Sequence, residues 1–280
     1  MYYRRKVMLA LLEGFNNEIL DEEFSKYLFL YTKEQENQNL KPSYFFVPGV
    51  VSFQANADKT TMTKYGLLAK NGRFWNKIDS ENYTSQLKKN EKELMKTFFK
   101  KYSHLSNNEI LKYLNKKYSY YTNKPRKMDS ENMKGLFTIG YEGISLEEYV
   151  NKLLKNNVNL LIDVRKNAFS MKYGFSKNQL EYALKKLGIK YLHVRNLGID
   201  SSKRQSLNSR EQYNDLFEEY EERILHKNQG ELSLILEKLK NFNKIALTCF
   251  EKDPDFCHRK RITNVLCKKS PEIKNFVFHL

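Results

Sequence analysis

The sequence contains few cysteines and no long apolar run. Three cysteines in 280 residues are too few for a disulfide framework, so a reducing compartment is expected. No stretch approaches the roughly 18 apolar residues that a membrane-spanning helix requires. The start, "MYYRRKVMLALLEGF", places basic residues before an apolar run, but that run is too short for a secretion signal and lacks a small-residue cleavage site. These absences predict a cytoplasmic protein with no membrane partner.

Acidic residues are in the minority. Lys and Arg number 49 against 33 Asp and Glu, which gives a net charge of +16 at pH 7. Both parts of the chain share the excess, since residues 1–134 carry 24 basic and 15 acidic side chains and the remainder carries 25 and 18. This balance favours a polyanionic partner, with nucleic acid, and DNA first, as the leading candidate. A Lys-rich genome would produce a similar composition without such a partner.

Residues 1–79 are expected to fold as a winged-helix-like module. The apolar spacing predicts a short helix at the start and a second in "LDEEFSKYLFLYTKE", before the β-prone run "SYFFVPGVVSFQ". A third helix in "ADKTTMTKYG" precedes two short strands around Asn71-Gly72, a dipeptide typical of hairpins. Three helices and a basic hairpin are the order of a winged helix, although such modules also mediate protein contacts. The residues expected to contact DNA are Lys59, Thr60, Lys64, Lys70 and Arg73.

A more polar stretch covers residues 80–134. Two amphipathic helices are expected in it, separated near Ser103 to Ser106. The segment "TNKPRKMDSENMK" then combines few apolar residues with a proline, which is typical of a linker. We therefore expect a helical extension that ends in a linker, with a domain boundary near residue 134.

Residues 135–280 show a different pattern. The short apolar runs "LFTIGYEG", "LLIDVRKN", "YLHVRNLG" and "IALTCFEKD" alternate with helical segments. Strands that alternate with helices indicate βαβ units, and continuously apolar strands fit a sheet covered on both faces. The predicted fold class is α/β, with a Rossmann-like, mostly parallel sheet in this domain and an α+β module before it.

Reactive side chains follow each of these predicted strands. In an open parallel sheet the ligand site lies at the carboxyl ends of the strands, so the four loops should converge there. The candidates for catalysis are Glu251, Asp163, Glu142, Tyr141 and Cys249. The candidates for binding substrate or phosphate are Arg165, Arg195, Lys252, His258, Arg259 and Lys172. Asp163 could instead simply pair with Arg165, and Cys249 could be a small buried apolar residue.

The cysteines of "ALTCFEKDPDFCHRKRITNVL" match neither the spacing of a zinc site nor the spacing of an anion-binding cysteine loop. Seven residues separate Cys249 from Cys257, and His258 directly follows Cys257. No second pair of cysteines or histidines has the usual spacing of metal ligands, so neither a metal nor a cofactor is expected. An anion-binding cysteine loop places an Arg six residues after the nucleophile, but that position is Asp255. Nearby carboxylates would also raise the pKa of the thiol. Carboxylates with aromatics and arginines suit a sugar or a base better.

The motifs "TIGYEG", "LIDVR", "FSKNQLEYALKKLGIKYLHVRNLG" and "CFEKDPDFCHR" closely resemble the family named domain of unknown function 488, over about residues 136–267. The resemblance implies a Rossmann-like α/β domain with a site built from these loops. "LIDVR" also looks like a strand of rhodanese sulfurtransferases, although the Cys-to-Arg loop is missing. The segments "FSKYLFLYTKE" and "LSNNEILKYLNKKY" look similar to helical modules of toxin–antitoxin and phage-defence proteins.

Together these patterns predict a protein that holds nucleic acid and processes a nucleotide or base within it. The expected reaction is hydrolytic, with Glu142, Asp163 or Glu251 as base or stabiliser, while Arg165 and Arg259 hold phosphate. The most specific form of this hypothesis is base excision, in phage defence or DNA modification. The alternatives are a non-catalytic DNA-binding regulator that senses a nucleotide ligand, and a sulfurtransferase that uses the thiol of Cys249.

Overall fold

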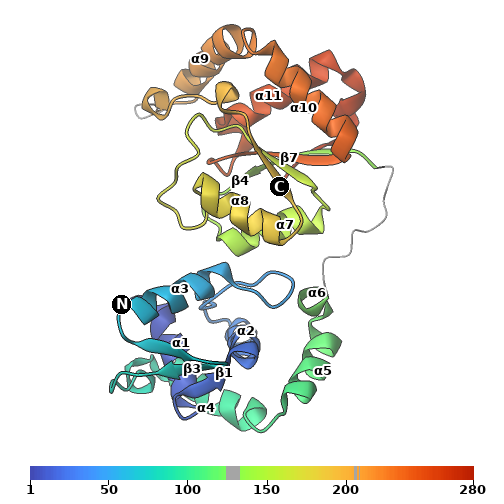
Figure 1. The fold of residues 1–280 in the computed structure, drawn as a ribbon. Coiled ribbons are helices and arrows are strands. Elements are labelled where there is room, and N and C mark those ends of the chain that lie inside the picture. Colours follow the sequence, from blue (N-terminus) through green and yellow to red (C-terminus); the bar gives the residue numbers. More distant parts are fainter. Residues whose placement is uncertain (124–132, 205–206, 208) are drawn as a thin grey trace. The chain divides into compact units, whose positions relative to one another are not determined.

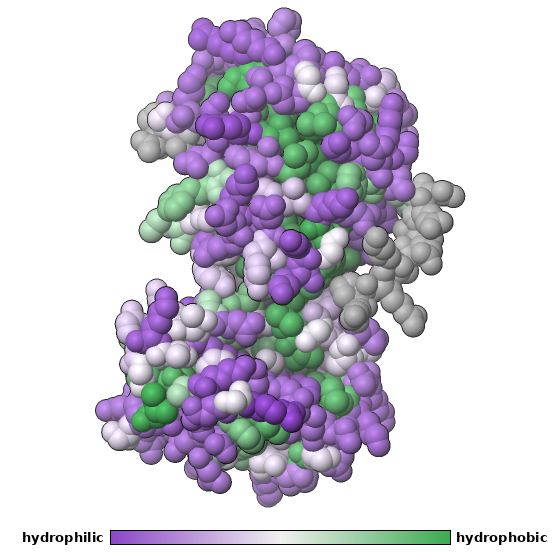
Figure 2. All heavy atoms as spheres, in the orientation of Figure 1, coloured by the Kyte–Doolittle hydropathy of each residue, from purple (hydrophilic) through white to green (hydrophobic). Residues whose placement is uncertain are grey.

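The computed structural model describes residues 1–123, 133–204, 207 and 209–280 (Figure 1). The chain divides into two compact units, Met1–Arg126 and Lys127–Leu280, each with its own hydrophobic core. Most of the predicted linker "TNKPRKMDSENMK" lies outside the described residues. Hydrophilic residues cover much of the face that Figure 2 shows. Within the described part of the chain, no helix is both long and apolar enough to cross a bilayer.

The first unit begins with a three-stranded antiparallel sheet and three helices. Its elements are α1 (Tyr3–Glu13), β1 (Glu18–Leu20), α2 (Asp21–Asn37), α3 (Phe53–Lys64), β2 (Leu68–Asn71) and β3 (Phe74–Lys77). The sheet order is β1-β3-β2. The predicted hairpin is confirmed, and Gly72 at its turn has the positive φ of 57° that favours glycine. The β-prone run before α3 forms a single bridge between Val47 and Val51, because the chain reverses at Pro48-Gly49.

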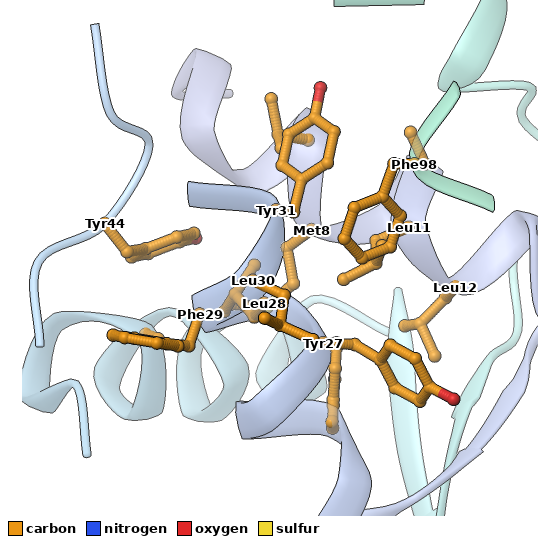
Figure 3. Close-up of a cluster of buried hydrophobic side chains, with 14 of the residues drawn as sticks. Met8, Leu11, Leu12, Tyr27, Leu28, Phe29, Leu30, Tyr31, Tyr44 and Phe98 are labelled. Atoms are coloured by element: carbon orange, nitrogen blue, oxygen red, sulfur yellow. The ribbon is translucent and has the colours of Figure 1, made fainter. Parts of the chain in front are cut away.

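The core of the first unit is built around α1 and α2. Six consecutive residues of α1, Val7 to Leu12, are fully buried, so this helix is surrounded by other elements. Figure 3 shows Met8, Leu11 and Leu12 beside the aromatic side chains of α2 and Phe98. Close packing of such side chains is the main stabilising contribution in a domain of this size.

The helices after residue 80 belong to the same core. They are η1 (Thr84–Gln86), α4 (Lys89–Tyr102), α5 (Asn107–Lys117) and α6 (Ser119–Thr122). Phe98 and Leu114 are buried in one cluster with the residues of α1 and α2. α5 starts at a capping box, in which Ser106 and Glu109 exchange hydrogen bonds. The expected helical extension is thus packed with residues 1–79 in one unit.

The second unit is an α/β domain with a five-stranded parallel sheet in the order β6-β5-β7-β4-β8. The strands are β4 (Gly135–Gly140), β5 (Leu160–Asp163), β6 (Lys190–His193), β7 (Lys244–Cys249) and β8 (Val277–His279). The α-helices are α7 (Leu146–Lys155), α8 (Lys177–Lys186), α9 (Arg210–Tyr220), α10 (Gln229–Phe242) and α11 (His258–Lys269). Short 3-10 helices lie at Arg195–Leu197, Ser201–Arg204, Pro254–Phe256 and Pro271–Phe276, and a π-helical turn at Glu221–Leu225.

Helices cover both faces of this sheet. α10 and α11 lie on one side of it and α7 and α8 on the other (Figure 1). On the first side, Ile235 of α10 and Ile262 of α11 join the cluster that contains Leu136, Ile162 and Leu247 of the strands. β4 and β5 are accordingly buried along their whole length, as the apolar runs predicted. The expected α/β fold is confirmed.

Candidate functional site

The strands of the α/β domain end at one level, so their loops share one edge. Gly140 of β4 pairs with Cys249 of β7, and Asp163 of β5 pairs with both Thr248 of β7 and His193 of β6. The residues that follow these positions leave the sheet side by side. This carboxyl edge is where open parallel sheets place their ligands.

A buried ion pair lies at the end of β5. Nε of Arg165 lies 2.9 Å from Oδ1 of Asp163, and Tyr191 donates a hydrogen bond of 2.7 Å to Oδ2. Arg165 also donates to the hydroxyl of Tyr141 at 2.8 Å and to the carbonyl of Phe175 at 2.9 Å. Although burial lowers the pKa of Arg165, the hydrogen bond and charge of Asp163 raise it above its usual range. Arg165 and Asp163 therefore tie three segments of the edge together.

Tyr141 connects this ion pair to the surface. Its ring stacks on Phe175 at a centroid distance of 4.3 Å and meets the edge of Phe250 at 5.3 Å. Lys172 donates a hydrogen bond of 2.6 Å to the carbonyl of Tyr141. Tyr141 is buried, whereas Phe250 is 44% exposed. The edge thus presents an aromatic ring to solvent beside a lysine.

The three candidate carboxylates differ in their exposure to solvent. Glu142 is exposed, and its Oε2 accepts a hydrogen bond of 2.9 Å from the backbone N–H of Lys252. Burial lowers the pKa of Lys172, and the charges of Glu148 and Glu142 oppose that shift. Glu251 is half-buried, while Asp163 is fully buried. Glu142 can meet a ligand directly, Oε2 of Glu251 is buried, and Asp163 is paired with Arg165.

Arg259 holds the loop that follows β7. Its guanidinium donates to the carbonyls of Glu251 and of Lys252, the latter at 2.8 Å, and to Oγ1 of Thr138 at 3.3 Å. Only 1% of Arg259 is exposed. A Cβ on Gly140 would lie 1.8 Å from the carbonyl oxygen of Glu251, so the end of β4 and this loop touch backbone to backbone. Arg259, expected to hold phosphate, is placed to position the Glu251 loop.

The structure brings three sulfur and nitrogen donors together at the start of α11. The donor atoms of Cys249, Cys257 and His258 all lie within 4.8 Å of one another, and all three side chains are buried. Burial raises the pKa of the Cys257 thiol, and Cys249 raises it further. Sequence spacing did not reveal this group, because Cys249 and Cys257 are not a closely spaced pair. The usable signal was one cysteine ending a strand and a second opening the next helix.

The remaining predicted residues of the edge are at the surface. Arg195 and Lys252 are exposed. His193 contacts the backbone carbonyl of Arg165 at 2.8 Å through Nε2, so it supports the loop after β5. That loop also carries Phe169, which is 65% exposed. The loops of the edge therefore carry both exposed basic and exposed aromatic side chains.

The predicted DNA contacts of the first unit fall into two groups. Lys59 is buried, with Nζ 4.2 Å from the ring centroid of Phe24, and burial lowers its pKa to about 8. Thr60, Lys64, Lys70 and Arg73 are exposed. Lys70 pairs with Asp21 at 2.5 Å and Arg73 with Glu22 at 3.3 Å. Lys59 belongs to the core of this unit, and the other four lie on its surface.

The second unit is an α/β domain with a Rossmann-like parallel sheet, and its loops cluster at the carboxyl ends of the strands. Residues 145–266 match the family model described as "Domain of unknown function DUF488", so the C-terminal part of the chain contains a domain of this family. The matched span includes Asp163, Cys249, Glu251 and Arg259, and it begins after Glu142. No curated protein and no solved structure matches the chain.

Proposed function

We propose that the protein binds nucleic acid through its N-terminal unit and acts on a nucleotide or base with its α/β domain. DNA is the nucleic acid to test first. The observation that carries the binding proposal is the exposed polar face of α3. Asn56, Thr60, Thr63 and Lys64 are all exposed, and their spacing places them on one side of the helix. α1 and α2, in contrast, are largely buried in the core.

The order of elements supports a winged-helix interpretation of the first unit. A helix, a strand, two helices and a hairpin follow one another, and the first strand joins the hairpin in the order β1-β3-β2. In helix-turn-helix modules of this kind, one helix enters the major groove while neighbouring segments contact the backbone. α3 and the β2–β3 hairpin take those positions in the chain.

The basic residues of the hairpin are paired, but their pairs are exposed. Lys70 and Arg73 meet Asp21 and Glu22 at the start of α2. Exposed ion pairs contribute only about 0–1 kcal/mol, so a phosphate can replace these carboxylates at small cost. Lys64 at the end of α3 adds a further exposed ammonium group. These groups suit phosphate contacts, while the amide of Asn56 and the hydroxyl of Thr60 suit base edges.

The carboxyl edge of the α/β domain suits the second part of the proposal. The exposed ring of Phe250 can stack on a base. Lys252 is exposed in the same loop, and Nζ of Lys172 contacts the carbonyl of Tyr141, so both could supply a cation to a phosphate. Glu142 and Glu251 supply carboxylates that can activate water or stabilise positive charge on a sugar. Hydrolytic base excision is the reaction that this combination supports best.

Anisotropy titration of the full chain against labelled duplex DNA tests the binding proposal. The variant Lys64→Glu/Arg73→Glu removes two exposed cations from α3 and the hairpin. The matched control, Lys112→Glu/Lys116→Glu, changes the net charge by the same amount at exposed positions of α5. We expect the first variant to weaken binding at least about tenfold and to lower the salt dependence, and the control to weaken it under about threefold. Equal effects of both variants would contradict a site on α3.

A further inference from the structure

A separate cluster of donors lies where β7 ends and α11 begins. Cys249 is the last residue of β7, Cys257 is the N-cap of α11, and His258 is the first residue of that helix. None of the three is more than 2% exposed. The loop that carries Glu251 runs between the two cysteines, so these side chains connect both ends of that loop.

The hydrogen bonding of His258 sets which ring nitrogen faces the cysteines. Nε2 lies 3.0 Å from the carbonyl oxygen of Val164. A carbonyl only accepts hydrogen bonds, so Nε2 carries the proton and Nδ1 offers its lone pair to the cluster. Histidines that bind metals almost always donate their other ring N–H to such a carbonyl or carboxylate. His258 is therefore held in the tautomer and orientation of a metal ligand.

The distances in the cluster fit a small tetrahedral centre. Sγ of Cys249 lies 3.6 Å from Nδ1 of His258. A tetrahedral ion with metal–sulfur bonds near 2.3 Å and metal–nitrogen bonds near 2.05 Å separates these two ligands by about 3.6 Å. Cys257 lies within 4.8 Å of both, and a tetrahedral centre separates two sulfurs by about 3.8 Å. The three donors therefore lie close enough to surround one ion.

We propose that Cys249, Cys257 and His258 bind a thiophilic transition-metal ion, with Zn²⁺ as the first ion to test. Binding converts two thiols to thiolates and releases two protons, and the charge of Zn²⁺ is then balanced by two thiolates and a neutral imidazole. A neutral complex suits a buried position. Three protein ligands leave one position of a tetrahedral ion for a water molecule or another donor. The ion joins the end of β7 to the start of α11 and so fixes the loop of Glu251.

Metal analysis of the purified chain by mass spectrometry tests this site without any nucleic acid. The chain is prepared under reducing conditions with Zn²⁺ in the growth medium and then desalted into metal-free buffer. We expect about one zinc per wild-type chain, and below about 0.2 for Cys257→Ser and for His258→Gln. Cys267→Ser is the matched control, because Cys267 lies on the same helix but outside the cluster. This variant should retain about one zinc per chain.

A second measurement does not depend on whether the variants fold. Reduced, metal-free wild-type chain is titrated with Co²⁺, and thiolate-to-cobalt absorption should saturate at about one equivalent and disappear when Zn²⁺ is added. Zn²⁺ should also raise the melting temperature, because a ligand that binds the folded state stabilises it. Absence of both zinc and a cobalt spectrum would overturn the proposal. Loss of zinc in Cys267→Ser to the same extent as in Cys257→Ser would overturn it too.

Discussion

Asp163 and Arg165, two residues apart at the end of β5, form an ion pair that is closed off from solvent. Nη2 of Arg165 lies 2.5 Å from Oδ2 of Asp163, and Asp163 is fully buried. The same guanidinium reaches Tyr141 after β4 and Phe175 before α8. One charged pair thus links the loop after β5 to the loop after β4, and Tyr191 joins β6 to the same pair.

Replacing Asp163 with Asn should strongly destabilise the α/β domain. The change leaves the guanidinium of Arg165 buried without its counter-charge, which costs about 3–5 kcal/mol in comparable cases. Urea denaturation at pH 7 measures the free energy of unfolding. Asp215→Asn, at an exposed position of α9, is the control and should change it by under about 0.5 kcal/mol. Similar values for both variants would show that the pair does not hold the edge.

Two glycine substitutions should have opposite effects on stability. Gly140→Ala places a Cβ 1.8 Å from the backbone carbonyl oxygen of Glu251, so strand and loop must separate, at a cost of at least about 2 kcal/mol. Gly230→Ala, in α10, meets nothing within 4 Å and should stabilise the helix by about 0.5–1 kcal/mol. Thermal denaturation of the two variants provides the comparison. A stable Gly140→Ala would mean that the loop after β7 is not held against β4.

Lys59 should make the stability of the first unit depend on alkaline pH. Burial lowers its pKa in the folded chain to about 8, against about 10.4 for an unfolded lysine. Between these values the unfolded state binds more protons, so the free energy of unfolding should rise as pH rises from 8 to 10.4. The penalty for charging Lys59 is fully present below pH 8.

Lys59→Met tests this linkage. The methionine should be more stable than the wild type at pH 7, by on the order of 2 kcal/mol, and the difference should shrink towards pH 10. The contact of Nζ with the ring of Phe24 opposes this effect because it favours the charged lysine. Lys64→Met, at the exposed end of the same helix, should change stability by under about 0.5 kcal/mol throughout. A pH-independent difference for Lys59→Met would contradict a depressed pKa.

Much of the fold was predictable because the relevant signals are local. Continuous apolar runs marked the central strands of the parallel sheet, and Asn71-Gly72 marked the hairpin. Two short strands, Glu18–Leu20 and Val277–His279, had no such signal. The first forms because β3, more than fifty residues later in the chain, offers it an edge. Such pairing is a property of the tertiary structure.

The site, like the fold, was predictable only where local sequence signals decide the structure. Parallel topology brings the candidate residues to one edge, but spacing alone did not reveal which side chains are buried. Arg259 turns inward to backbone carbonyls, and Lys59 turns towards Phe24, because the rotation of each helix against its neighbours decides the direction. The donors Cys249 and His258 meet because one ends a strand and the other begins a helix that returns to it. Those relations depend on packing between elements.

Product analysis tests whether the protein processes a nucleotide or base. The full chain is incubated with single-stranded and duplex DNA and RNA, and released bases and alkali-labile sites are measured by chromatography and gels. We expect a product with one of these substrates, at a rate that Glu251→Gln or Glu142→Gln lowers at least about a hundredfold while binding is retained. Tight binding without product from any substrate would contradict it and favour a regulator. Loss of product in Cys249→Ser, with both Gln variants active, would contradict it and favour thiol chemistry.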